Sequence, residues 1–124
     1  MRDAIHPLLL SAFLLLATFA PLSAQGFVSG IEDLPLMPGL TETDEGSLVF
    51  ESATGRFVEV YAIGNVEPVN VTAFYGESLP QLGWSPAGPT IYRRDGEVLM
   101  IEYLPAGETG VPLTVRFALS PAGN

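Results

Sequence analysis

The stretch IYRRDGEVLM, residues 91–100, decides how this chain folds. Asp95-Gly96 lies at its centre, between two runs whose residues suit β-strands. An Asp-Gly pair in that position favours a two-residue type I′ turn, so the stretch predicts a tight β-hairpin. Because directly opposed residues share one face of a sheet, the turn also fixes which side chains lie together. The predicted pairs are Arg94 with Glu97, Arg93 with Val98, Tyr92 with Leu99 and Ile91 with Met100.

Other segments on both sides of this hairpin alternate between apolar and polar residues, as strands do. Downstream, residues 113–119 place Leu113, Val115, Phe117 and Leu119 on one face. Upstream, residues 47–51 and 56–63 are predicted to form a second hairpin, joined by residues 52–55. Strands joined by short connections pair antiparallel, so the sheet is predicted to be antiparallel.

Between the two hairpins the apolar period changes to that of a helix. Asn70 is the predicted N-cap, with Val69 before it placed to pack on Phe74. Pro80 and Gly83 are predicted to end the helix, because proline blocks a backbone hydrogen bond and glycine accepts a left-handed cap. The residues that fall on one side of this helix are Val71, Phe74, Tyr75, Ser78, Leu79 and Leu82.

Tyr75 and Trp84 are the aromatic residues with two interpretations. As large rings with polar tips, they suit a ligand-binding platform. As apolar residues at helical spacing, they suit closure of the helix onto the sheet. The spacing favours the second interpretation.

The order of predicted elements is β-β-α-β-β-β, which defines the fold class. We expect an α+β fold with an antiparallel β-sheet of about five strands and one helix packed on one face. Residues 1–24 are predicted to be a signal peptide and residues 25–46 an extended, irregular, Pro-containing lead. The lead includes the acidic run TETDEG, residues 41–46. Residues 47–124 then form a single α+β domain.

The N-terminal segment has the pattern of a secretory signal. Arg2 precedes the apolar run LLLSAFLLLATFA, residues 8–20, which is shorter than the ~20 residues needed to span a bilayer. Pro21 ends the run, and LSA precedes Gln25, the expected mature terminus. The sequence therefore predicts an exported, periplasmic protein with no stable membrane anchor after cleavage. An uncleaved anchor is the alternative.

The composition restricts the chemistry of the chain. The sequence has 14 acidic and 5 basic residues, a net charge of -9 and no cysteine. This charge disfavours binding to nucleic acid or to anionic membranes. The single histidine, His6, lies in the signal peptide, so the usual neutral-pH bases and tunable nucleophiles are missing. We therefore predict no enzyme and no cofactor.

Two acidic features remain as alternatives. Glu59 and Glu102 lie in mid-strand positions and are candidates for the paired carboxylates of a hydrolase. The run 41–46 does not match the ligand spacing of an EF-hand, because its alternating positions before Gly46 are Thr41, Thr43 and Glu45. A looser calcium site stays open there, although no metal site is predicted.

The sheet is predicted to be apolar on both faces, and one helix covers only one of them. Toward the helix we place Leu48, Phe50, Val58, Val60, Ala62, Leu99, Ile101, Val115 and Phe117. On the second face we place Phe57, Tyr61, Ile63, Ile91, Val98 and Met100. Exposed apolar patches of this kind mark interfaces. Either the lead covers this face through Leu34, Leu36, Met37 and Leu40, or another protein or a second copy does.

The second face supplies the functional hypothesis. Phe57, Tyr61, Ile91, Val98 and Met100 are the predicted partner-binding residues. We expect a non-enzymatic exported binding or accessory module that acts through protein–protein contact, with another envelope protein as its partner. A self-associating structural envelope protein is the alternative, and a carboxylate-dependent hydrolase is the alternative from the enzyme class.

A resemblance adds to these predictions. The segments DLPLMPGL (33–40), AFY (73–75), LPQLGW (79–84) and YRRDGE (92–97) resemble a family of small uncharacterised exported proteins from proteobacteria. The likeness covers most of the chain after residue 24. It implies a small α+β domain in which the aromatic residues of the helix serve packing, and it implies no catalytic or other functional residue.

Overall fold

The computed structural model describes residues 26–105 and 112–123, which form one antiparallel sheet with one α-helix. The helix α1 (Pro68–Ser78) is followed by a short 3₁₀ turn, η2 (Pro80–Leu82). The predicted α+β class is confirmed, but the sheet has six strands rather than about five. The strands are β1 (Thr41–Ser52), β2 (Gly55–Gly64), β3 (Ser85–Gly88), β4 (Ile91–Arg94), β5 (Glu97–Pro105) and β6 (Leu113–Pro121).

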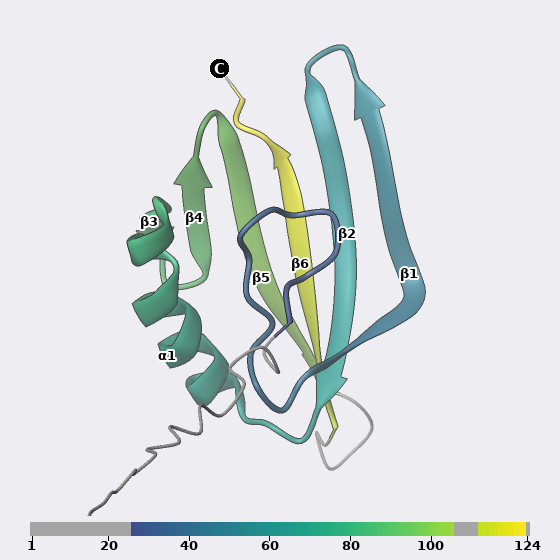
Figure 1. Cartoon of the computed structure of the whole chain (residues 1–124), viewed down its shortest axis with the longest axis vertical. Helices are drawn as coiled ribbons and strands as arrows, with labels where there is room; N and C mark the ends of the chain where they lie inside the picture. Colours follow the sequence, from purple (N-terminus) through teal and green to yellow (C-terminus); the bar gives the residue numbers. More distant parts are fainter. Residues whose placement is uncertain (1–25, 106–111, 124) are drawn as a thin grey trace, which may run out of the picture.

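The sheet order is β1-β2-β6-β5-β4-β3, and α1 makes the long crossover in it (Figure 1). After β2 the chain passes through α1 to the far edge, where β3 begins. It then returns strand by strand until β6 lies beside β2. Strand β3 was not predicted, because its sequence SPAG has a proline and a glycine and no apolar alternation.

The hairpin of β4 and β5 has the predicted geometry. All four predicted residue pairs are present. Asp95 and Gly96 both have positive φ, 52° and 78°, as a type I′ turn requires. The local turn chemistry therefore fixed this register correctly.

The hairpin of β1 and β2 differs from the prediction in its turn, its face and its length. Ser52 pairs with Gly55, so the turn is shorter than expected, but Phe50 still lies opposite Phe57, whose side chain faces away from the helix. Leu48 and Phe50 therefore lie on the face away from the helix, and the predicted inward placement of both is wrong. Strand β1 also begins at Thr41, so the acidic run assigned to the irregular lead belongs to the sheet, with a register shift between Thr43 and Leu48.

The helix starts earlier than predicted and ends as predicted. Glu67, in an extended conformation, precedes Pro68 at the first helical turn, where proline's fixed φ favours helix initiation. The N-cap prediction at Asn70 is therefore wrong, and Val69 is exposed rather than packed on Phe74. At the other end Gly83 adopts φ 93° after η2, which is the left-handed conformation expected of it.

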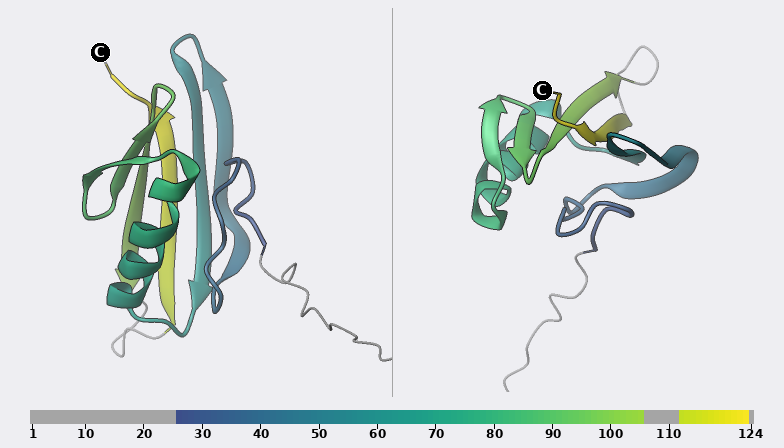
Figure 2. Two further views of the ribbon diagram at one scale, coloured as in Figure 1. Left: turned by 60° about the vertical axis from the view of Figure 1, so that its left-hand side comes forward. Right: turned by 90° about the horizontal axis from the view of Figure 1, so that it is seen from above.

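Helix α1 and residues 26–40, to which the name lead now refers, cover the same face of the sheet (Figure 2). We call this the inner face and the opposite one the outer face. Gly30 of the lead lies against Val58, so closely that a β-carbon there would be 3.2 Å from the valine Cγ1. The alternative in which the lead covers the second face is therefore wrong. The lead contributes Val28, Ile31, Leu34 and Leu40 to the buried core, and the helix contributes Val71, Tyr75 and Leu79.

Tyr75 joins the helix, the lead and the sheet at the centre of this core. Its hydroxyl donates to the Pro35 carbonyl oxygen at 2.7 Å and accepts from the Met37 N–H at 3.1 Å. Its ring packs edge-on against Phe117 with centroids 5.5 Å apart. Trp84 is also buried. The interpretation of both aromatic residues as core is confirmed.

Candidate functional site

All five predicted partner-binding residues lie on the outer face. Phe57 and Tyr61 come from β2, Ile91 from β4, and Val98 and Met100 from β5. The register places Met100 opposite Ile91 and opposite Ala118, which in turn pairs with Glu59. Met100 is 38% exposed and the other four are half-buried. One side of the sheet thus carries the whole predicted set.

The hairpin register adds two large side chains that the sequence analysis had assigned to the inner face. Leu48 and Phe50 are 48% and 46% exposed. The rings of Phe50 and Phe57 stack with centroids 4.9 Å apart. These side chains and Met100 line a groove of about 240 Å³ on the outer face. The groove gives the apolar face a shape into which a partner's side chain can fit.

A charged row crosses the middle of the outer face. Arg116 of β6 lies between β2 and β5 and forms ion pairs with Glu59 on one side and Glu102 on the other. The Tyr61 hydroxyl donates to the second oxygen of Glu59 at 3.4 Å. The hydrogen bonds to Glu59 and then to Glu102 raise the pKa of Arg116 above its usual value. The three charged groups are half-buried and leave a net negative charge.

This row bears on the hydrolase alternative. Glu59 and Glu102 do converge, as their mid-strand positions suggested, but they converge on Arg116. In a glycosidase the two carboxyl groups flank the scissile bond, whereas here Arg116 stands between them and forms an ion pair with each. The arrangement links three neighbouring strands. Sequence reasoning missed Arg116 because its neighbours depend on the order of β2, β6 and β5.

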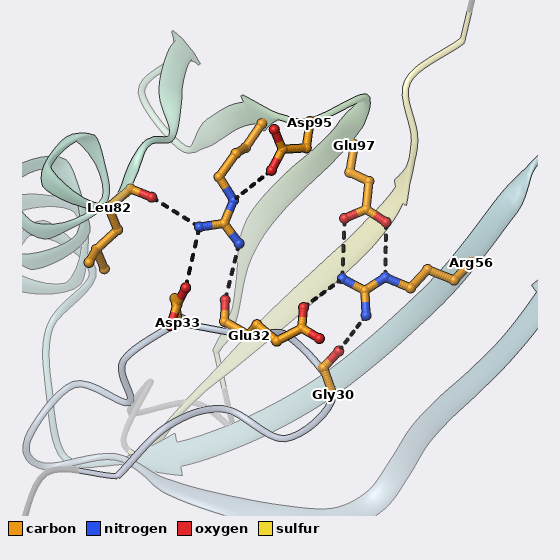
Figure 3. Close-up of polar contacts among 8 residues, drawn as sticks. Gly30, Glu32, Asp33, Arg56, Leu82, Asp95 and Glu97 are labelled. Atoms are coloured by element: carbon orange, nitrogen blue, oxygen red, sulfur yellow. Dashed lines mark hydrogen bonds and ion pairs between the residues drawn. The ribbon is translucent and has the colours of Figure 1, made fainter.

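Two other arginines, Arg56 and Arg94, bind backbone carbonyl oxygens of the lead (Figure 3). Arg56 binds Glu97 through two hydrogen bonds, of 2.9 and 3.2 Å, and donates to the Gly30 carbonyl oxygen at 3.2 Å. The hydrogen bond to Glu97 raises the pKa of Arg56. A planar guanidinium suits such a bidentate contact. Arg56 therefore ties the lead's turn to the top of β2 and β5.

Arg94 makes the second attachment. It donates to the carbonyl oxygens of Leu82 at 3.0 Å and of Glu32 at 3.1 Å. Its guanidinium carbon lies 4.3 Å from the centroid of the Trp84 ring, a cation–π distance. Neither Arg56 nor Arg94 was assigned a role from the sequence, because their partners are backbone oxygens and acids far along the chain.

The acidic run of β1 does not gather around one point. Glu42 accepts hydrogen bonds from the backbone N–H and hydroxyl of Ser29. Across residues 26–105 and 112–123, no three His, Cys, Asp or Glu side chains come close enough to hold a metal ion. In the same part of the chain no helix is both long and apolar enough to cross a bilayer.

Comparisons with protein-family models, with curated proteins and with solved structures found no match to this chain. The resemblance to small exported proteins therefore stays a prediction. The apolar groove and the charged row of the outer face are the features of the chain that bear on its function.

Proposed function

We propose that this protein is a non-enzymatic, exported binding module that acts by contact between the outer face of its sheet and another protein. The observation that carries the proposal is the uneven cover of the two faces. Both the helix and the lead pack on the inner face. Leu48, Phe50 and Met100 stay between 38% and 48% exposed around one groove on the outer face. Grouped apolar side chains of this kind gain free energy when a partner removes them from water.

The partner is proposed to be a different protein rather than a second copy. The chain has a net charge of -9, while the outer face itself carries Arg93 and Arg116 beside Glu59 and Glu102. Two copies of so acidic a chain repel each other, whereas a neutral or basic protein is not repelled. The net charge therefore favours a heterologous contact.

Export is proposed from the N-terminal pattern alone. Residues 1–24 have a basic start, a short apolar run and a small-residue cleavage site. These residues and Gln25 lie outside the described part of the chain. Intact mass measurement of the exported protein tests this, and the expected chain begins at Gln25.

Site-specific photocross-linking in the source organism tests the binding role. A photoreactive residue is placed at position 100 on the outer face, and in a matched chain at position 69 on α1. Val69 is apolar and 67% exposed, but it stands on the helix away from the outer face. We expect covalent adducts with another protein from position 100 and few from position 69.

Three other results would contradict the proposal. Equal adducts from both positions would indicate nonspecific encounter, and no adducts from either would leave the outer face as ordinary solvated surface. Adducts of twice the chain's own mass would replace the heterologous partner with self-association.

A further inference from the structure

The two edges of the sheet are protected to different degrees. An edge strand leaves alternate N–H and C=O groups without a partner strand, which invites pairing with another chain. Strand β3, at one edge, has 4 residues and contains Pro86, which removes one donor. Strand β1, at the other edge, has 12 residues and pairs only with β2. Its register shift ends at Leu48, where regular pairing with β2 resumes, and all of residues 47–51 are exposed.

Apart from the charge of Glu51 at its end, this part of β1 lacks the usual protection of an edge. Neither lysine nor proline occurs between residues 47 and 51. The neighbouring side chains of Leu48, Val49 and Phe50 are all exposed, Val49 by 62%. Successive side chains of a strand point to opposite faces, so the edge strand has exposed apolar side chains on both faces of the sheet.

A groove flanks the edge on each side of the sheet. Leu48 and Phe50 form one wall of the 240 Å³ outer groove. Val49 and Glu51 line a second groove of about 440 Å³, between β1 and the lead, with Phe27 opposite them. A strand added along β1 would direct its side chains alternately toward these two sides.

The charge around the edge selects the chemistry of the added strand. The groove beside the lead carries Glu32, Asp33 and Glu51 at its rim, and its single base, Arg56, is bound to Glu97 and Glu32. Strand β1 carries Glu42, Asp44, Glu45 and Glu51 and no base. A second copy of β1 would bring acids to acids, whereas lysine or arginine side chains would complement them.

We infer that residues 47–51 of β1 are the docking edge for an extended, basic segment of another protein, which adds to the sheet as a further strand. This inference rests on the proposed function, because it specifies the form and charge of the partner. Backbone hydrogen bonds to the edge provide affinity, the outer groove selects apolar side chains at alternate positions, and the acidic rim of the groove beside the lead selects basic side chains at the positions between them.

Peptide binding to the protein purified from cells expressing the full chain tests this inference. The probe is a fluorescent peptide of about eight residues, a usual strand length, in which valine alternates with arginine and threonine. Its matched control has glutamate in place of arginine. We expect the basic peptide to raise fluorescence anisotropy and to slow amide exchange at residues 47–51 by about tenfold, while exchange in β3 is unchanged.

Charge reversal at the edge supplies the specific variant. Glu51→Arg should lower the affinity for the basic peptide by about fivefold and raise the affinity for the acidic peptide. The substitution replaces attraction of the basic peptide at the rim with repulsion. Glu77→Arg makes the same charge change on the exposed side of α1 and should alter neither affinity. Val49→Lys places a cation on the edge itself and should also lower the affinity for the basic peptide. Thermal melts of all variants confirm that each is folded.

The outcomes separate the inference from the proposed function. Binding without protection at residues 47–51, or binding that Glu51→Arg does not change, overturns the docking edge. So does a lack of binding by either peptide, or a stable dimer in light scattering. In each of these cases except the dimer, cross-links from position 100 to another protein would still support contact through the outer face.

Discussion

The two faces of the sheet use similar strand residues but differ in what covers them. On the inner face Val60, Phe117 and Leu99 are sealed by α1 and by the lead, and each is at most 2% exposed. On the outer face Phe50 and Met100 keep a large part of their surface in water. The comparison indicates that folding depends on the inner face, while the outer face is available for contact. Substitutions on the two faces should therefore have separable effects.

The largest expected effect is on the inner side, at Trp84. Trp84→Ala should lower the free energy of unfolding by about 3–5 kcal/mol, because it leaves a cavity under Arg94. The indole N–H of Trp84 has no hydrogen-bond partner among the described residues, so packing is its main contribution. Trp84→Phe should then retain most of the stability. Urea unfolding measures both, and a small loss in Trp84→Ala would place this ring outside the core.

Tyr75→Phe should have the next largest effect. It leaves the Pro35 carbonyl and the Met37 N–H without their hydroxyl partner while it keeps the ring against Phe117. A buried polar group that loses its partner lowers the free energy of unfolding by about 1–3 kcal/mol, so the midpoint of urea unfolding should fall. An unchanged midpoint would show that the lead is not held through this hydroxyl.

The same tyrosine predicts how stability changes with pH. Burial is the main cause that raises the pKa of Tyr75, and the pKa values of Tyr92 and Tyr103 are raised for the same reason. The unfolded chain loses these protons above pH about 10, while the folded chain keeps them. Stability should therefore be intact below pH about 10 and fall as pH rises further. The decline should be shallower in Tyr75→Phe, and equal slopes in both proteins would contradict this assignment.

Arg116→Gln should have a smaller effect, since its ion pairs are partly exposed. We expect a loss of about 1 kcal/mol at neutral pH, because Glu59 and Glu102 are left facing each other. The loss, measured by urea unfolding, should shrink at high ionic strength, because salt screens partly exposed ion pairs. A loss that does not depend on salt would mean that Arg116 acts by packing alone.

The parts of the fold that could be predicted are those set by local chemistry. Asp95-Gly96 alone determines its turn, and the helical spacing of Val71, Tyr75 and Leu79 identified the buried side of α1. Strand β3 could not be predicted, because its pairing with β4 overrides a sequence with proline and glycine. The face of Phe50 was predicted wrongly although the predicted turn already gives the observed pairing, because residues directly opposite each other share a face and Phe57 faces outward.

The candidate site shows the same division. Alternation along β2, β4 and β5 was enough to group Phe57, Ile91 and Met100 on one face. The contact of Arg116 with two glutamates depends on which strands are neighbours, and that order follows from the crossover through α1. The position of the lead could not be predicted either, since its packing beside the helix depends on Arg56, Arg94 and Tyr75 acting across the core.

The smallest effect on stability should be that of Met100→Asp, and this variant provides the most direct test of separable faces. A photoreactive residue at position 48, on the same outer groove, reports contact while the aspartate disrupts the neighbouring apolar surface. We predict that Met100→Asp changes the free energy of unfolding by less than about 0.5 kcal/mol and removes most adducts from position 48. Adducts of undiminished yield, in a protein that remains folded, would contradict a contact role for the outer face.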